Sequence, residues 1–225
     1  MADTQMGTGK AETEGGTAAA LRLSRRQVLT LAAAGGAALA LPRMGWPGRA
    51  RAQSAASGAG TITEFLLPSA DSQPGGVVAG PDGALWFAEV HGNRIARITT
   101  DGQISEVPVP TLNSSTVRLT VGPDNAIWFA EIVGDQIGRL GMDGTISEYP
   151  VTGMEPVGIA AGPDGAIWFT GFKSNEIGRL TLDDTLTKYP APTAKSIPYH
   201  IAAGPDGAMW FTEQAGNQIG RLQVQ

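Results

Sequence analysis

The stretch Gly80-Pro81-Asp82-Gly83-Ala84-Leu85-Trp86-Phe87-Ala88-Glu89 recurs with small changes in three further copies, and this repeat decides the fold. Its other copies occupy 122–131, 162–171 and 204–213. Their tryptophans are spaced by 42, 40 and 42 residues and stand at Trp86, Trp128, Trp168 and Trp210. That spacing is typical of a four-stranded propeller blade, which must pack against neighbours to bury its apolar faces. The sequence therefore predicts an all-β fold, a β-propeller of about four four-stranded blades.

Each repeat unit carries the signals of four strands. In the first unit the expected strands cover 77–80, 84–89, 94–98 and 104–107. Because side chains alternate along a strand, Trp86 and Phe87 are expected on opposite faces, where neighbouring blades cover both. Asp101-Gly102 predicts a tight hairpin before the outermost strand, as does Asp143-Gly144. Asp183-Asp184 departs from that pattern, so the third hairpin is expected to be looser.

The two ends of the repeat region complement each other. The fourth copy stops after its third strand, at residues 221–225, whereas residues 61–68 match the fourth-strand segments 145–150 and 185–190. The N-terminal strand is therefore expected to complete the last blade and close a ring, which removes a free sheet edge. Two alternatives stay open: a fragment of a larger ring, and two chains that share one ring. The chain is accordingly expected to be a monomer or a homodimer.

The N-terminal residues 1–52 have the three parts of an export signal. Ser24-Arg25-Arg26-Gln27-Val28-Leu29 is a twin-arginine signature, 29–41 is apolar, and Ala50-Arg51-Ala52 offers a cleavage site. Those 13 apolar residues are fewer than the roughly 20 that span a bilayer. We expect a twin-arginine signal over 1–52, a short linker over 53–60 and the propeller over 61–225, in a periplasmic or secreted protein without a transmembrane span. A membrane anchor or a buried helix is the alternative.

Composition excludes several kinds of chemistry. The formal net charge is −5, but residues 53–225 hold 9 Lys and Arg against 18 Asp and Glu, a net charge of about −9. Such a surface repels phosphate backbones, so no nucleic-acid partner is expected. The chain contains no cysteine, which excludes disulfides, thiolate nucleophiles and Cys-ligated zinc.

Three repeated motifs carry a resemblance to a known family. They are Gly-Pro-Asp-Gly-Ala-Leu-Trp-Phe-Ala/Thr-Glu, Gly-Asn-x-Ile-Gly/Ala-Arg-Ile/Leu and Ile-Ser/Thr-Glu-Tyr/Phe-x-x-Pro. Over residues 61–225 the chain resembles the streptogramin B lyase (virginiamycin B lyase) family, of which it looks like a shortened member. The resemblance implies a propeller related to a seven-bladed ring. It also implies an enzyme that opens a cyclic depsipeptide by elimination across an ester, with Mg²⁺ and a histidine base.

The family's site residues map only partly onto this sequence. Glu155-Pro156-Val157-Gly158-Ile159 matches the family's Glu-Pro-His-Gly-Ile pattern, with Val157 in place of the base. Pro198-Tyr199-His200-Ile201 carries its histidine one residue later, which on a strand changes the side to which it points. The family's other metal-binding glutamate corresponds to positions without a carboxylate: Val90, Ile132, Phe172 and Gln214.

Polar residues are predicted to gather around one mouth of the propeller. Positions just before the innermost strand and just after the second strand lie at the same end of a blade; here they include Glu89, His91, Glu131, Glu155, Tyr199, His200 and Glu213. Carboxylates and imidazoles can bind a divalent cation, and a neutral imidazole can remove a proton next to a carbonyl. We assign His200 and His91 as catalytic, Glu155 and Glu89 as Mg²⁺ ligands, and Tyr199, Glu213 and Glu131 as substrate-binding.

Other repeated residues are predicted to be structural. The tryptophans are expected between blades, and one blade position always holds an arginine: Arg97, Arg139, Arg179 and Arg221. The repeated Glu89, Glu131 and Glu213 have the same structural interpretation as an alternative.

Two functions of different classes remain. One is an exported lyase of the streptogramin type, which opens an ester in a cyclic depsipeptide or related substrate. The other is a non-catalytic envelope propeller that binds a small molecule, peptide or protein at its mouth.

Overall fold

The computed structural model describes residues 52–57 and 60–224, all within a unit that extends from Gly45 to Gln225. These residues form 17 strands, and none of the described residues forms a helix that is long and apolar enough to cross a membrane. The export signal predicted over residues 1–52 lies outside the described residues except for Ala52, and it stays a prediction.

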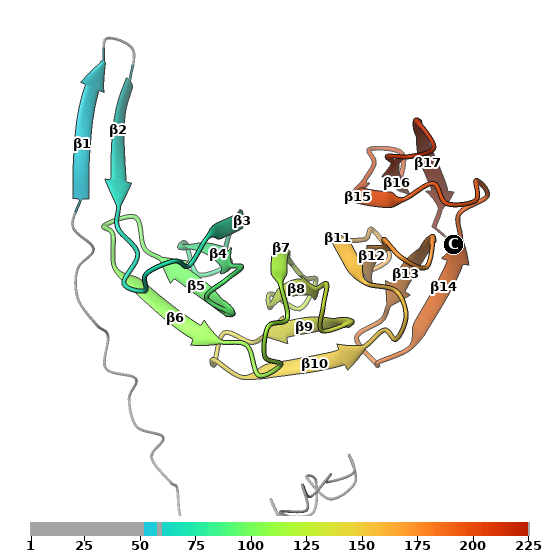
Figure 1. The fold of residues 1–225 in the computed structure, drawn as a ribbon, viewed down its shortest axis with the longest axis horizontal. Helices are drawn as coiled ribbons and strands as arrows, with labels where there is room; N and C mark the ends of the chain where they lie inside the picture. Colours follow the sequence, from blue (N-terminus) through green and yellow to red (C-terminus); the bar gives the residue numbers. More distant parts are fainter. Residues whose placement is uncertain (1–51, 58–59, 225) are drawn as a thin grey trace, which may run out of the picture. The chain divides into compact units, whose positions relative to one another are not determined.

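Four antiparallel sheets correspond to the four repeats (Figure 1). The first contains β3 (Pro74–Ala79), β4 (Leu85–Glu89), β5 (Arg94–Ile98) and β6 (Ile104–Pro108). The second contains β7 (Thr116–Val121), β8 (Ile127–Glu131), β9 (Gln136–Leu140) and β10 (Ile146–Pro150). The third contains β11 (Pro156–Ala161), β12 (Ile167–Gly171), β13 (Glu176–Leu180) and β14 (Leu186–Pro190). The fourth has only β15 (Pro198–Ala203), β16 (Ala208–Glu213) and β17 (Gln218–Gln223).

The sheets lie side by side in the order of the sequence. Their first strands contact one another in turn, β3 with β7, β7 with β11 and β11 with β15, while β6, β10 and β14 lie on the outside (Figure 1). This arrangement confirms the predicted propeller-type sheets. Within the unit they follow an arc, with the first and fourth sheets at its two ends (Figure 1).

The turns between the third and fourth strands are alike in the three complete sheets. Gly102 and Gly144 have φ of 86° and 85°, the left-handed region that the hairpin requires. Asp184 takes the same place with φ of 68°, and its amide donates to the Thr181 carbonyl at 3.1 Å. The prediction of a looser third hairpin was therefore wrong, because aspartate tolerates this conformation.

Each junction between neighbouring repeat sheets holds a buried cluster that contains a tryptophan of one sheet and the phenylalanine of the next. Trp86 shares its cluster with Phe129, Trp128 with Phe169, and Trp168 with Phe211. The adjacent Trp and Phe of one strand thus serve two different junctions, as strand alternation predicts.

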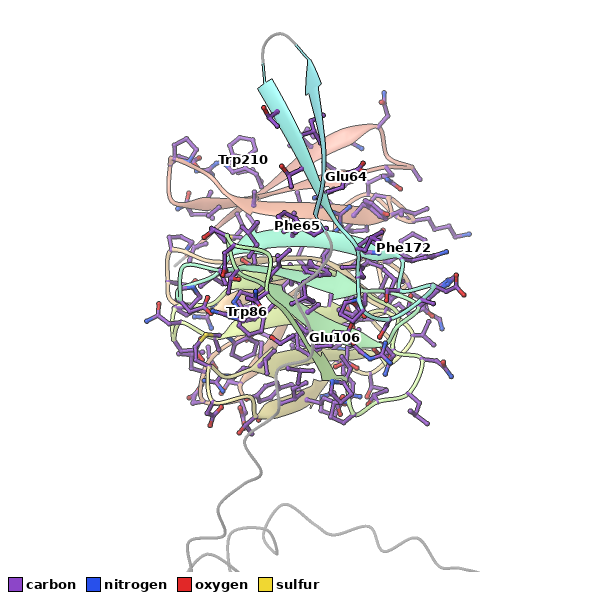
Figure 2. The ribbon with its side chains drawn as sticks, turned by 90° about the vertical axis from the view of Figure 1, so that its left-hand side faces the viewer. Glu64, Phe65, Trp86, Glu106, Phe172 and Trp210 are labelled. Atoms are coloured by element: carbon purple, nitrogen blue, oxygen red, sulfur yellow. The ribbon has the colours of Figure 1, made fainter. Side chains whose placement is uncertain are left out.

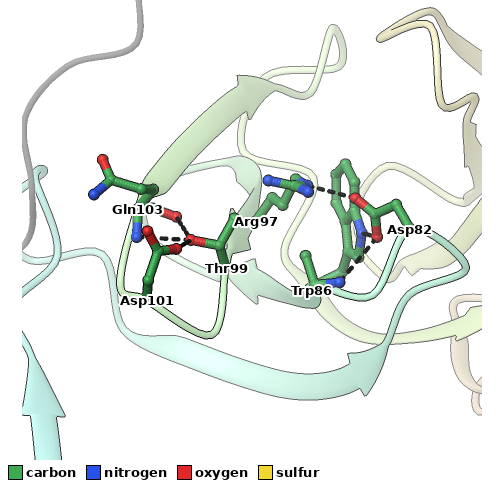
Figure 3. A network of polar contacts seen from close by, with 7 residues as sticks. Asp82, Trp86, Arg97, Thr99, Asp101 and Gln103 are labelled. Atoms are coloured by element: carbon green, nitrogen blue, oxygen red, sulfur yellow. Dashed lines mark hydrogen bonds and ion pairs between the residues drawn. The ribbon is translucent and has the colours of Figure 1, made fainter.

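An Asp–Trp–Arg clasp recurs in each of the four repeat sheets, made by Asp82, Trp86 and Arg97 in the first (Figure 3). The indole Nε1 donates to one carboxylate oxygen at 3.0 Å, and the arginine Nε donates to the other at 2.5 Å while its guanidinium lies 6.0 Å from the ring centroid. The other clasps are Asp124–Trp128–Arg139, Asp164–Trp168–Arg179 and Asp206–Trp210–Arg221. The repeated arginines are structural, as predicted.

The N-terminal strand does not complete the fourth sheet of its own chain. β2 (Gly60–Phe65) pairs with β1 (Ala52–Ser57), whose residues after Ala52 fall in the stretch predicted as a linker. The fourth sheet keeps three strands within the described residues, so the expected ring closure is not observed. The open arc explains the difference, since β2 lies beside the first sheet and β17 lies at the other end of the arc (Figure 1).

Candidate functional site

The innermost strand of each of the four repeat sheets has a register shift at the same place. In β15 the pairing passes from Pro198–Glu213 to Ile201–Phe211, so two residues of β15 face one residue of β16. Such a β-bulge re-aims side chains and is common beside functional sites. The four two-residue bulges, called here the bulge pairs, are Gly75-Gly76, Val117-Arg118, Val157-Gly158 and Tyr199-His200.

The backbone before each bulge pair is held in an unusual conformation. Glu155 and Ile197, which precede β11 and β15, have φ of 49° and 56°. This left-handed region is unfavourable for a β-branched residue such as Ile197. The Ile197 carbonyl accepts a hydrogen bond from the Gln214 amide at 3.0 Å, which fixes the turn at the start of β15.

The bulges of β11 and β15 lie in close contact at Gly158. A Cβ atom on Gly158 would lie 2.5 Å from the Tyr199 carbonyl oxygen and 3.1 Å from the His200 Cα. The Thr170 hydroxyl accepts from the Gly158 amide at 2.8 Å and donates to the Tyr199 carbonyl at 3.1 Å. Only glycine allows this approach, so Gly158 positions the Tyr199-His200 bulge.

Three side chains from two of these bulges converge. The Arg118 guanidinium of β7 lies over the Tyr199 ring of β15, 5.4 Å from its centroid, across β11. The His200 ring meets the Tyr199 ring edge-on, with 5.8 Å between centroids. Arg118 Nε is buried and makes no hydrogen bond to any described part of the chain. Arg118, Tyr199 and His200 thus form a cluster on the inner strands, called here the inner-wall cluster.

The charge of Arg118 contributes to the pKa of His200. Partial removal of the His200 ring from water, and then the nearby Arg118 charge, lower the pKa of His200 below 6.5. At neutral pH the imidazole is therefore mainly uncharged and can accept a proton. The His200 amide donates to the Thr212 hydroxyl at 3.0 Å, so the backbone that carries the ring is fixed.

The repeated glutamates lie at the ends of their strands and inside the protein. Glu89, Glu131 and Glu213 are all buried. Burial, and then the charge of Glu148, raise the pKa of Glu131 to about 8, so this group is mostly protonated at neutral pH. Burial and Glu106 raise the pKa of Glu89, although Arg94 lies 3.6 Å from its carboxylate. Buried carboxyls of this kind are poor candidates for contact with a substrate.

The remaining candidates lie apart from the inner-wall cluster. Glu155 pairs with Lys173 at 2.8 Å on the surface, and His91 is exposed in the turn after β4. Among the described residues no three His, Asp or Glu side chains lie together as metal ligands. The donor set therefore does not fit the Mg²⁺ site implied by the family resemblance. Of the seven predicted site residues, the structure brings together only Tyr199 and His200.

Sequence reasoning missed Arg118. The sequence did contain a signal for it, because the second residue of the bulge pair is not the same in all blades. In sequence order these residues are Gly76, Arg118, Gly158 and His200. A position that varies between repeat units is not fixed by the packing that all the units share.

Comparison with known proteins supports the fold and the sequence resemblance. A family model described as the virginiamycin B lyase family matches residues 46–225. The chain is similar to a solved streptogramin B lyase structure, with a TM-score of 0.67 and 37% identity over 74% of this chain and 59% of the other. It is also similar to a catalytically inactive virginiamycin B lyase from Staphylococcus aureus solved with quinupristin, with a TM-score of 0.68 and 39% identity over 73% and 60% of the two chains.

A curated relative matches over a short stretch of the chain. This virginiamycin B lyase of Saccharopolyspora erythraea is 48% identical over 42 residues, 19% of this chain and 14% of its own length. The chain therefore spans about three fifths of the solved lyase chains and a much smaller part of this curated relative.

Proposed function

Because the chain belongs to the virginiamycin B lyase family, we propose that its inner-wall cluster binds a cyclic depsipeptide or a related ester and opens it by elimination. The observation that carries the proposal is the placement of an uncharged imidazole, His200, beside Tyr199 and Arg118. An aromatic ring and a guanidinium next to a proton acceptor suit a ligand that offers apolar groups and carbonyl oxygens.

The proposed step uses His200 as the base. The imidazole takes a proton from the carbon next to a carbonyl, the electron pair forms a carbon–carbon double bond, and the ester carbon–oxygen bond breaks. The ester oxygen leaves as a carboxylate, so the product is an isomer of the substrate. Negative charge develops on the carbonyl oxygen during this step, and Arg118 is the nearby cation that can stabilise it.

No part of this step depends on a metal ion. Mg²⁺ remains an expectation from the family resemblance. Of the two ligands assigned to it, Glu155 forms an ion pair with Lys173, and Glu89 lies 3.6 Å from Arg94. Export by the twin-arginine route to the periplasm or the exterior belongs to the proposal and rests on residues 24–29. The net charge of about −9 over residues 53–225 supports a partner other than nucleic acid.

A specific observation favours binding without catalysis as a second function. Val157 stands where the family pattern has its histidine, and it is buried in the structure. His200 then lacks a second imidazole nearby, since His91 lies in the turn after β4. The same inner-wall cluster would in that case hold a small molecule or peptide and leave it unchanged.

The test is incubation with quinupristin, followed by chromatography and mass spectrometry. Elimination predicts a new species of unchanged mass with an added double bond, whereas hydrolysis would add one water. His200→Ala is expected to lower turnover by a factor on the order of 10² or more, and His91→Gln is the matched control. A parallel reaction with chelator determines whether Mg²⁺ contributes.

Calorimetric titration with quinupristin separates the two functions. Binding that weakens in Arg118→Gln, without any isomer formed by the unchanged chain, supports the second function and excludes the first. Neither binding nor conversion would contradict both. Equal turnover in the unchanged chain and in His200→Ala would remove His200 as the base.

A further inference from the structure

Two sheet faces in the described part of the chain have no neighbouring sheet, and the first is on β3 and β4. Val77 and Leu85 are 60% and 43% exposed there. Residues at the same two positions are buried in the other sheets; they are Leu119, Ile159 and Ile201, and Ile127, Ile167 and Met209. The apolar side chains of this face are therefore of the kind that packs against a preceding sheet.

The second open face is on β16 and β17. Trp210 is 38% exposed and Ile219 is 64% exposed, whereas Trp128, Trp168 and Ile177 are buried at the same positions. In the second sheet, for example, Trp128 belongs to the buried cluster that also contains Phe169 of the following sheet. The first sheet thus presents one half of the repeated junction and the fourth sheet presents the other half.

The fourth sheet also lacks an outer strand that β2 can supply. In the second and third sheets a tyrosine of the outer strand stacks on the clasp tryptophan, Tyr149 on Trp128 at 5.4 Å and Tyr189 on Trp168 at 5.6 Å. Trp210 has no such ring contact among the described residues. Residues 62–65, Ile-Thr-Glu-Phe, match 146–149, Ile-Ser-Glu-Tyr, so Phe65 is the counterpart of these tyrosines.

Phe65 already occupies the position of an outer-strand aromatic beside the first sheet. Its ring lies against Gly102, where an added Cβ would come within 2.5 Å of the ring (Figure 2). Tyr149 likewise lies near the equivalent hairpin of the third sheet, since burial, and then the charge of Asp184 at the position equivalent to Gly102, raise the pKa of Tyr149. β2 is therefore placed as the outer strand of a sheet that would precede β3–β6.

The β1–β2 hairpin has little support of its own. Residues 60–64 are exposed, and Ile62 is an exposed apolar side chain. A lone two-stranded hairpin is at best marginally stable in water. β2 uses one edge for β1 and has no other strand partner among the described residues, so its second edge is free to pair.

We propose that two copies of this chain form one ring, in which β2 of each copy becomes the fourth strand of the β15–β17 sheet of the other. The open face on β3 and β4 of one copy would pack against the open face on β16 and β17 of the other. Phe65 of the first copy would cover Trp210 of the second. Four sheets correspond to about three fifths of the solved lyase chains, and in this chain they follow an open arc (Figure 1). Two copies supply eight sheets, within the known propeller range of about 4–8, and a two-fold axis makes the two new junctions identical.

The register of the new pair follows from the complete sheets. Leu186 lies opposite Leu180 in the third sheet, so Ile62 of one copy is expected opposite Leu222 of the other. The chain has no cysteine, which makes engineered disulfides specific. Mixing Ile62→Cys chains with Leu222→Cys chains under oxidising conditions is expected to give a disulfide-linked heterodimer. Ile62→Cys mixed with Val133→Cys, an exposed position in the β8–β9 turn, is the control and is expected to give none.

Light scattering of the unsubstituted chain gives an independent readout. The proposal predicts the mass of two chains, and it is overturned by the mass of one chain. It is also overturned if Ile62→Cys and Leu222→Cys form a disulfide only when both are in one chain, since that would show closure within a single copy. Equal cross-linking in the control mixture would show that the contact is not specific, and would overturn the assigned register.

Discussion

The Asp–Trp–Arg clasps and the bulge pairs lie in the same sheets and behave in opposite ways. In the four clasps the indole–carboxylate distance stays at 2.9–3.0 Å and the guanidinium lies 5.7–6.0 Å from the ring centroid. The four bulge pairs share a backbone register shift, but each pair has a different two-residue sequence. What repeats is therefore the packing, and what varies is the chemistry presented on the inner strands.

The largest expected effect comes from removing a clasp. Trp168 is buried between the third and fourth sheets and donates to Asp164 at 2.9 Å. Trp168→Ala is expected to lower the free energy of unfolding by about 3–5 kcal/mol. His200→Ala, on an exposed bulge, is expected to change it by no more than about 0.5 kcal/mol. Urea unfolding followed by circular dichroism measures both; equal losses would remove the distinction between clasp and bulge.

A smaller effect is expected where two bulge pairs meet, at Gly158. A Cβ there collides with the Tyr199 carbonyl oxygen, a backbone atom that cannot rotate away, so Gly158→Ala is expected to cost about 1–3 kcal/mol. Gly60→Ala is the control, because nothing lies within 4 Å of its added Cβ. Similar unfolding midpoints for the two variants would contradict the close approach of β11 and β15.

A pH-dependent effect is expected from the buried Glu131. Its pKa is raised from 4.5 to about 8 in the folded state, so the protein is stabilised below pH 4.5 and loses that stabilisation as the pH rises through about 8. Glu131→Gln cannot ionise and is expected to lose less thermal stability between pH 5 and pH 9 than the unchanged chain does. Melting temperatures measured across this range test it, with exposed Glu64→Gln as control; parallel curves for Glu131→Gln and the unchanged chain would contradict the raised pKa.

The repeat made most of the fold predictable from sequence. The turn residues and the Trp-Phe alternation indicated the strands and the sheet junctions, because packing between equivalent blades constrains the same positions each time. The partner of β2 was not predictable, since the segment matches an outer strand wherever a three-stranded sheet is available.

The candidate site was predicted only in part. Tyr199 and His200 were among the residues predicted at the mouth of the propeller, but Arg118 was missed because its contact crosses a whole strand. Two residues are needed for that contact, Gly158 to leave space and Tyr199 to receive the guanidinium. The glutamates were placed at the correct strand ends, yet sequence could not show that burial keeps them from a ligand.

The smallest expected effect is a shift in the pKa of one histidine. It tests the central claim, which is that side chains of separate bulge pairs meet on the inner strands. The chain has only two histidines, so with His91→Gln a single imidazole remains to be followed by NMR titration. We predict a pKa of His200 below 6.5, and a rise in that pKa when Arg118→Gln removes the neighbouring charge. A His200 pKa that is unchanged by Arg118→Gln would show that the two side chains do not meet.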